Sequence, residues 1–246
     1  MSGYSGTVVG VDGCPVGWLA TEIDADGVRM ETYEKFEELD NVYKEADRIL
    51  VDIPIGLGED ERRACDEDAR DLLGSRGLSV FYPPSQSAVK IPDYERAKKE
   101  HHNRIGHGLS QQGHSIAHKI QEVADVVEKE YDGRVRESHP ELCFAALNGQ
   151  PIAYSKSSDR GRGLRMKVLS DELEDAEDQY EKVRNNYLVK EVRRDDILDS
   201  MVLALAARND CLATVPTNPS LDEPRIYYPN FVTPILTKQG LPLQYR

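Results

Sequence analysis

The sequence predicts an α/β protein with a mixed five-stranded sheet flanked by helices. Three features of the chain lead to this prediction. Short runs rich in apolar and β-branched residues recur before residue 57, and a helical pattern precedes the last of them. A mainly helical stretch over 58–134 leads into one further short run. The most apolar helical stretch of the chain begins at Asp196 and continues to residue 207.

The expected strands and their connections follow in chain order. The strands are residues 7–13, 15–24, 28–33, 48–56 and 134–138. Asp24-Ala25-Asp26-Gly27 supplies the turn between the second and third strands. Residues 34–46 form a polar helix whose apolar side chains share one face. This order predicts a three-stranded meander and a fourth strand reached through a helical crossover.

Helical periodicity dominates the rest of the chain. The expected helices are residues 59–73, 115–131, 140–147, 164–189 and 196–207, and residues 81–84 form a proline-containing loop. Residues 58–134 are therefore a mainly helical insertion between the fourth and fifth strands. We expect one domain over residues 1–246, with the proline-rich residues 214–246 packed on its core as an extended tail.

Composition narrows the functional classes. The 31 basic and 44 acidic residues give a net charge of −13, which opposes non-specific binding to nucleic acid unless a local basic patch overrides it. The four cysteines are widely scattered without a Cys-x-x-Cys pair, so neither a zinc site nor a disulfide framework is indicated. No apolar run approaches 18 residues, so we expect a soluble, cytoplasmic protein without a membrane partner. Nothing in the sequence indicates an oligomeric state.

Two acidic residues open the most apolar helix. Asp196 and Asp199 are three positions apart, so they share one face at the start of a helix whose body is predicted to be buried. Carboxylates that repel each other near a core need a compensating cation, and a divalent metal is the usual one at a functional site. The alternative is a solvated first turn, where Asp is favoured by capping and by the helix dipole.

Two further aspartates lie in predicted strands. Asp12 ends the first apolar run, and Asp52 lies inside the fourth. An Asp in a buried strand is unfavourable unless it is paired, protonated or bound to a metal. Turn chemistry at Asp12-Gly13 is an alternative for the first of them. Together with Asp196 and Asp199, these residues form a four-carboxylate constellation.

A short basic segment reverses the charge of this acidic chain. Over twelve residues five cations accompany a single acid, Asp159; the cations are Lys156, Arg160, Arg162, Arg165 and Lys167. Guanidinium groups suit phosphate recognition, so we expect this segment to bind nucleic-acid phosphates. The alternative is a flexible, solvated loop. A second cluster around His101, His102 and His107 is diluted by glutamates and lacks the i, i+4 histidine spacing of a zinc site.

The strand order and the acidic motifs resemble the ribonuclease H-like superfamily. The motifs that carry the resemblance are Val9-Gly10-Val11-Asp12-Gly13, Gly13-Cys14-Pro15-Val16-Gly17-Trp18, Leu50-Val51-Asp52-Ile53-Pro54, Asp52-Ile53-Pro54-Ile55-Gly56-Leu57, Glu137-Ser138-His139-Pro140-Glu141 and Asp195-Asp196-Ile197-Leu198-Asp199-Ser200. They span about residues 8 to 207 and look like the Holliday-junction resolvase branch. More closely, they resemble a family of uncharacterised, predicted ribonuclease H-like nucleases. The fourth-strand acid is Asp52 rather than the Glu of the resolvases, which shortens its reach by one methylene.

The resemblance implies a metal-dependent nuclease. Asp12 would bridge two Mg²⁺ or Mn²⁺ ions, with Asp52 on one ion and Asp196 or Asp199 on the other, and the ions would promote hydrolysis of a phosphodiester bond in DNA or RNA. Glu137 is a further candidate catalytic acid in a second layer or in proton transfer. Glu141 and His139 are candidates for similar roles, and their alternative is a structural role at a helix start.

Two other classes of function remain open from the sequence. Actin-like phosphotransferases share this core and use a first-strand Asp and the following glycine turn to hold Mg-nucleotide, as Asp12-Gly13 would. They use two tandem copies of the core, however, and 246 residues leave no room for a second. A non-catalytic binding protein would present its acidic surface and the charged 164–189 helix to a partner.

Overall fold

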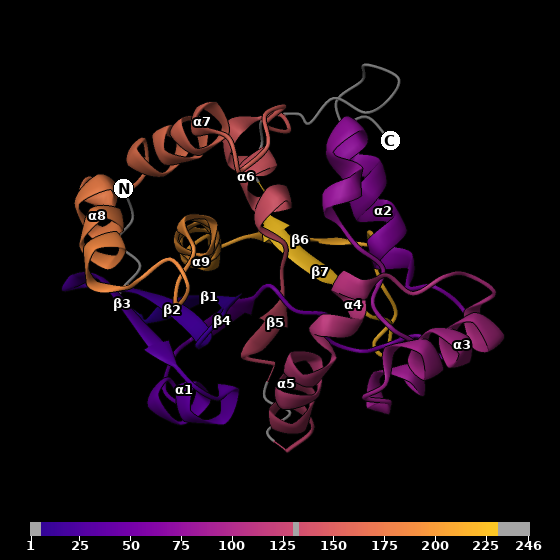
Figure 1. Ribbon diagram of the computed structural model, residues 1–246. Helices are drawn as coiled ribbons and strands as arrows, with labels where there is room; N and C mark the ends of the chain where they lie inside the picture. The colour runs from indigo at the N-terminus through magenta and orange to yellow at the C-terminus, as the bar shows by residue number, and fades with distance from the viewer. Residues whose placement is uncertain (1–5, 130–132, 231–246) are drawn as a thin grey trace.

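The sheet that organises the protein has five strands, as the sequence predicts. A computed structural model describes residues 6–129 and 133–230. The strands are β1 Val8–Cys14, β2 Gly17–Asp24, β3 Gly27–Tyr33, β4 Arg48–Val51 and β5 Val135–Glu137, in the spatial order β3-β2-β1-β4-β5. β1, β2 and β3 pair in antiparallel fashion, whereas β4 is parallel to both β1 and β5. This mixed sheet and its flanking helices are consistent with a ribonuclease H-like fold (Figure 1).

The helical insertion between β4 and β5 is confirmed. It contains α2 Ala64–Leu73, the 3-10 helices η1 Gly74–Ser79 and η2 Ala88–Lys90, and then α3 Tyr94–Ile105, α4 Gln111–Ser115 and α5 Ala117–Lys129. The other helices are α1 Phe36–Val42, α6 Pro140–Asn148, α7 Asp159–Ser170, α8 Ala176–Asn186 and α9 Arg194–Ala207. Within the described residues no helix has both the length and the apolarity that crossing a membrane requires. All four cysteines are free thiols.

The predicted single helix over 164–189 is wrong. The structure has two helices, α7 and α8, separated by residues 171–175. Acidic residues are unfavourable at a helix C-terminus and favourable at an N-terminus, and residues 171–175 are rich in acids. They therefore end α7 and precede α8. The helix predicted over 115–131 is likewise divided, because Ile116 separates α4 from α5.

The C-terminal segment also differs from the predicted extended tail. Residues Leu212–Val215 form β6 and Ile226–Pro229 form β7, which pair as an antiparallel two-stranded sheet. Tyr227 forms an isolated parallel bridge with Ser138, directly after β5. Residues 231–246 of the predicted tail lie outside the described residues.

Each face of the main sheet has its own hydrophobic core. On one face α9 packs against β1, β2 and β4, and α6, α7 and α8 pack around α9 (Figure 1). On the other face α1 and α5 pack together over side chains such as Val9, Val11 and Ile49. Side chains alternate between the faces of a strand, so Gly10 and Asp12 of β1 share the face toward α9.

Gly10 brings α9 close to the sheet. A Cβ atom at Gly10 would lie only 2.0 Å from the backbone nitrogen of Ala204 and 2.3 Å from the backbone oxygen of Ser200. The backbone of α9 therefore rests directly on β1, which only glycine permits. This contact sets the distance between Asp12 and the first turns of α9.

Candidate metal centre

The four predicted aspartates come from three elements that meet at one end of the sheet. Asp12 is near the end of β1, and Asp52 directly follows the parallel strand β4, with its backbone nitrogen donating to Val11. The carboxyl ends of parallel strands meet at the same edge of a sheet. Asp196 and Asp199 lie in the first two turns of α9, which crosses β1 and β4 on the face where Asp12 lies. The fold therefore brings the constellation together.

Burial and mutual repulsion define the electrostatics of this cluster. Burial raises the pKa of Asp12 well above its ordinary value, and the carboxylates of Asp52, Asp199 and Asp196 raise it further. Burial is also the main cause that raises the pKa of Asp52. The pKa values of Asp196 and Asp199 rise to about 6, again chiefly because of burial. These four acids act on one another, and each favours a compensating positive charge.

Asp196 and Asp199 differ in their partners. A carboxylate oxygen of Asp196 accepts a hydrogen bond of 2.8 Å from the backbone nitrogen of Arg193, which caps α9. Asp199 is only 1% exposed, and its Oδ1 atom accepts no hydrogen bond from any described residue. A buried carboxylate oxygen without a partner is costly, so it is available as a ligand.

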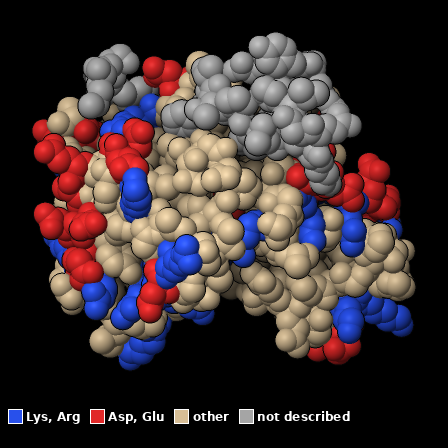
Figure 2. Space-filling model, turned by 90° about the horizontal axis from the view of Figure 1, so that it is seen from above, with Lys and Arg blue, Asp and Glu red and all other residues tan. Residues whose placement is uncertain are grey.

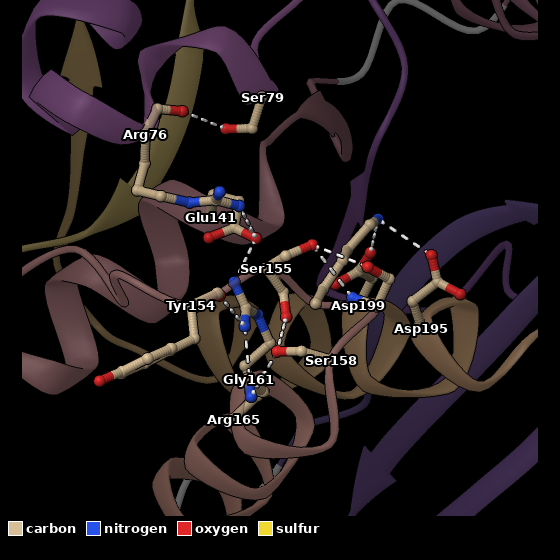
Figure 3. Close-up of polar contacts among 12 residues, drawn as sticks. Arg76, Ser79, Glu141, Tyr154, Ser155, Ser158, Gly161, Arg165, Asp195 and Asp199 are labelled. Atoms are coloured by element: carbon tan, nitrogen blue, oxygen red, sulfur yellow. Dashed lines mark hydrogen bonds and ion pairs between the residues drawn. The ribbon is translucent and has the colours of Figure 1, made fainter.

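Lys156 supplies positive charge to this cluster. Its Nζ atom lies 2.5 Å from Oδ2 of Asp199 and 3.5 Å from Oδ2 of Asp195. Burial opposes the charge of Lys156, but Asp199 and Asp12 outweigh burial and hold the pKa of Lys156 above its usual range. Figure 3 labels Asp195 and Asp199, the two carboxylates that Lys156 contacts at the start of α9.

The residues present fit Mg²⁺ or Mn²⁺ chemically. Carboxylate oxygens are the ligands that both ions prefer, and the buried Oδ1 of Asp199 needs a partner. The ligand atoms of the aspartates lie further apart than those of the most closely spaced candidate ligand group among the described residues. That group is Cys65, Asp66 and Glu137, whose donor atoms all lie within 4.8 Å of one another, and no three of the aspartates meet this distance.

The two carboxylates of the Cys65–Asp66–Glu137 group share one buried arginine. Arg63 donates from Nη2 to Glu137 at 2.6 Å and to Asp66 at 2.5 Å, and also from Nη1 to Glu137 at 2.8 Å. Burial raises the pKa of Glu137 to about 7, against the opposing effect of Arg63. A guanidinium between two carboxylates supplies ionic partners to both, so we interpret this group as a structural ion cluster.

The predicted catalytic acid Glu137 is therefore not brought together with the four aspartates. Glu137 pairs in register with Val51, one residue before Asp52. Neighbouring positions along a strand point to opposite faces, so the Glu137 and Asp52 side chains leave the sheet on different sides. The backbone nitrogen of Ile55 also donates to Glu137, at 2.6 Å.

Glu141 and His139 lie beside Asp52. The nearby His139 lowers the pKa of Asp52 and the nearby Glu141 raises it, both less than burial does. His139 caps α6, because its Nδ1 atom accepts from the backbone nitrogen of Glu141 at 3.2 Å. Glu141 accepts a 2.5 Å hydrogen bond from Arg165 and lies 3.7 Å from Arg76 (Figure 3).

The basic segment is mostly helical and is not the flexible loop that was the alternative to phosphate binding. Its last four cations lie in α7, whose N-cap is Ser158, and most of them have acidic partners. Arg165 is fully buried and bonds to Glu141, while Arg162 pairs with Asp159 and Lys167 with Asp171. Arg160 stacks over the Tyr154 ring, 4.0 Å from its centre. Arg165 is thus a structural residue, and Lys156 contacts the aspartates. Binding of phosphate by this segment stays a prediction.

Two features of this region escape sequence reasoning. Gly161, which looks like a loop residue, lets the first turn of α7 lie close to the preceding segment, because a Cβ there would lie 1.9 Å from the Ser155 carbonyl oxygen. Lys119 of α5 stacks over the Trp18 ring at 4.3 Å and donates to the Gly17 carbonyl oxygen. The charges of Asp12 and Asp196 also act on it, so Lys119 is a second cation beside the cluster. No local sequence pattern marks Lys119, because its contact with Gly17 joins residues 102 positions apart.

The outer surface is strongly uneven in charge. Figure 2, seen from above, shows acidic side chains gathered along the edge on the side of α8. The exposed acids of that region are Asp171, Glu172, Glu174, Glu177, Asp178 and Glu181. A cavity of about 230 Å³ lies between α7, α8 and α9 and is lined partly by Met166, Tyr180 and Leu198. None of the four aspartates lines it, so the candidate centre is a separate feature.

Comparison with known proteins gives one match. A family model described as "Protein of unknown function (DUF429)" matches residues 10–221, well over half of the chain. The matched range contains all four aspartates and Lys156. The search of curated proteins found no match, and neither did the search of solved structures. By the extent of the family match, the chain belongs to the DUF429 family.

Proposed function

We propose that the protein is a ribonuclease H-like nuclease that hydrolyses phosphodiester bonds with two Mg²⁺ or Mn²⁺ ions. The observation that supports this most directly is the convergence of three buried carboxylates, Asp12, Asp196 and Asp199, with the half-buried Asp52 that follows β4. One oxygen of Asp199 has no hydrogen-bond partner among the described residues. Such a cluster costs stability unless cations compensate it.

The proposed ligands are Asp12, Asp52, Asp196 and Asp199. Asp12 feels the charge of the other three, which suits a central, shared ligand. When bound, the two ions supply an activated water and neutralise the charge that develops on the departing oxygen. His139, which acts on Asp52 electrostatically, is the proposed group for proton transfer.

The substrate in this proposal is DNA or RNA. The acidic surface beside α8 disfavours approach of a polyanion from that side. Lys156 and Lys119 offer positive charge beside the aspartates. Phosphate is therefore expected to approach the carboxylate cluster between these cations, and not over α8.

A cleavage screen tests the proposal. Purified protein is incubated with single-stranded, duplex and branched DNA and with RNA, with Mg²⁺ or Mn²⁺ and separately with a chelator. We expect cleavage of at least one substrate with metal only. The variant Asp12→Asn should lower the rate by roughly a thousandfold or more, because it removes a charge from the central ligand.

The matched control is Asp171→Asn, prepared in the same way. Asp171 is exposed and pairs with the exposed Lys167, so its loss should leave the cleavage rate within about twofold. Cleavage that persists in Asp12→Asn, or in the presence of chelator, would contradict the proposed mechanism.

A further inference from the structure

Lys156 makes the one ion pair to a proposed ligand within the described residues. Its ammonium lies 2.5 Å from Oδ2 of Asp199, whereas Oδ1 of the same carboxylate has no partner. The second carboxylate that it contacts, Asp195, is not one of the four proposed ligands. Lys156 therefore connects Asp199 of the cluster with Asp195, and both carboxylates are labelled in Figure 3.

The backbone around Lys156 is held firmly, so the ammonium is aimed at the cluster. The hydroxyl of Ser158 donates to the Ser155 carbonyl oxygen at 2.7 Å, and the Ser158 backbone nitrogen donates to the same oxygen at 3.0 Å. The buried Arg165 donates to the Tyr154 carbonyl oxygen at 3.1 Å. These bonds fix the segment on both sides of Lys156 and leave its long side chain as the movable part.

A divalent cation and this ammonium compete for one carboxylate. Both are positive, and a cation on Asp199 would repel an ammonium held 2.5 Å from Oδ2. The Lys156 side chain is 40% exposed, so it has a route to solvent, while Asp199 is buried and fixed in α9.

We infer that Lys156 is a built-in counter-ion that neutralises Asp199 in the metal-free protein and is displaced when a divalent cation binds. This inference rests on the proposed metal site and adds to it. The displaced ammonium stays on its anchored segment beside the cluster, where it offers its charge to a substrate phosphate. Lys156 thus compensates the charge of Asp199 when no metal is bound. It lowers the metal affinity, because the ammonium must leave before the metal binds.

Calorimetric titration of metal-stripped protein with Mn²⁺, without nucleic acid, tests this inference. Lys156→Met keeps the length of the side chain and removes its charge. We expect it to bind Mn²⁺ roughly tenfold more tightly than the wild type, because no ammonium has to leave Asp199. Lys156→Gln, a smaller polar replacement, should shift the affinity in the same direction. Lys156→Arg keeps the charge and should bind no more tightly than the wild type.

Lys182→Met is the matched control, since Lys182 is exposed on α8, outside the basic segment, and its loss should leave the affinity unchanged. Equal or weaker Mn²⁺ binding by both Lys156→Met and Lys156→Gln, with binding by the wild type intact, would overturn the counter-ion role alone. Absence of Mn²⁺ binding in the wild type and in all variants would overturn the proposed metal site as well.

Discussion

At the scale of residues, the four aspartates are held in a state that favours their protonation. Burial is the first cause of each raised pKa, and repulsion among the carboxylates adds to it for Asp12 and Asp199. Buried acids elsewhere in the chain are compensated by a different cation. Glu137 and Asp66 share hydrogen bonds and ion pairs with the buried guanidinium of Arg63. In the aspartate cluster, the ion pair that the described residues provide comes from the partly exposed Lys156.

The raised pKa of Asp196 gives a prediction for stability against pH. The pKa rises from 3.8 to about 6 on folding, so the protonated form is favoured in the folded state. The stabilisation of the folded state by protonation of Asp196 is fully present below about pH 4 and is lost as the pH rises through about 6. Asp196→Asn keeps a side-chain oxygen that can accept the hydrogen bond from the Arg193 backbone nitrogen. It also removes the carboxylate whose ionisation destabilises the folded state at higher pH. In chelator, the variant should therefore gain roughly 2 kcal/mol relative to the wild type between pH 4 and 7.5.

Urea denaturation at a series of pH values measures this difference. The exposed Asp171→Asn serves as the control, because its ion pair with Lys167 is worth little at any pH. A free-energy difference between wild type and Asp196→Asn that stays constant across this range would show that Asp196 is not held in a repulsive, buried cluster.

At the scale of elements, the position of the site depends on how closely α9 approaches β1. Gly10→Ala forces a Cβ atom to within 2.0 Å of the α9 backbone, so the helix must shift. We expect a loss of about 3 kcal/mol or more in the free energy of unfolding, at the upper end for overpacked sites. Mn²⁺ affinity should fall as well, because Asp196 and Asp199 move with the helix.

Gly163→Ala is the matched control for this change. Gly163 lies inside α7, and a Cβ there meets nothing within 4 Å. Alanine should stabilise that helix by about 0.5–1 kcal/mol and leave Mn²⁺ affinity unchanged. Calorimetry and urea denaturation of both variants measure the pair. A stable Gly10→Ala protein with normal Mn²⁺ affinity would contradict the role of this contact.

Local sequence patterns predict the elements of this fold better than the contacts between them. The period of apolar residues predicts the five strands and the buried α9 helix, because each pattern is set by burial of one face. It does not predict the break between α7 and α8, where the charges of residues 171–175 outweigh a continuous apolar stripe. The apolar stripe over 164–189 is real, but two helices share it.

In the candidate site too, local patterns predict the acidic residues but not the contacts that they make. An Asp inside an apolar strand and an i, i+3 pair on a buried helix are visible as local conflicts with burial, so all four aspartates are predictable. The pairing of Glu137 with Arg63 depends on residues 74 positions apart, and that of Lys156 with Asp199 on residues 43 apart. No local pattern encodes such contacts. Cations that appear free in the sequence therefore prove to be counter-ions of buried acids.

At the scale of the whole molecule, the exposed acids are unevenly distributed and two lysines lie beside the candidate centre. The chain carries a net charge of −13, and exposed acids gather around α8. Lys156 and Lys119 lie beside the buried aspartates. A protein of this charge attracts divalent cations in general, so a specific site must be distinguished from diffuse surface binding. Diffuse binding is screened by salt, whereas coordination by buried carboxylates is screened much less.

We propose that the four aspartates form a divalent-metal site. The most direct test is to measure the melting temperature of the protein at increasing Mn²⁺ concentrations in high salt. We predict a melting temperature that rises with Mn²⁺ as expected for binding to the folded state, and no rise for Asp12→Asn. Glu137→Gln, an acid-to-amide change in the Arg63 cluster, should lower the starting temperature and keep the full rise. A wild-type melting temperature that is indifferent to millimolar Mn²⁺, or an equal rise in Asp12→Asn, would contradict the account.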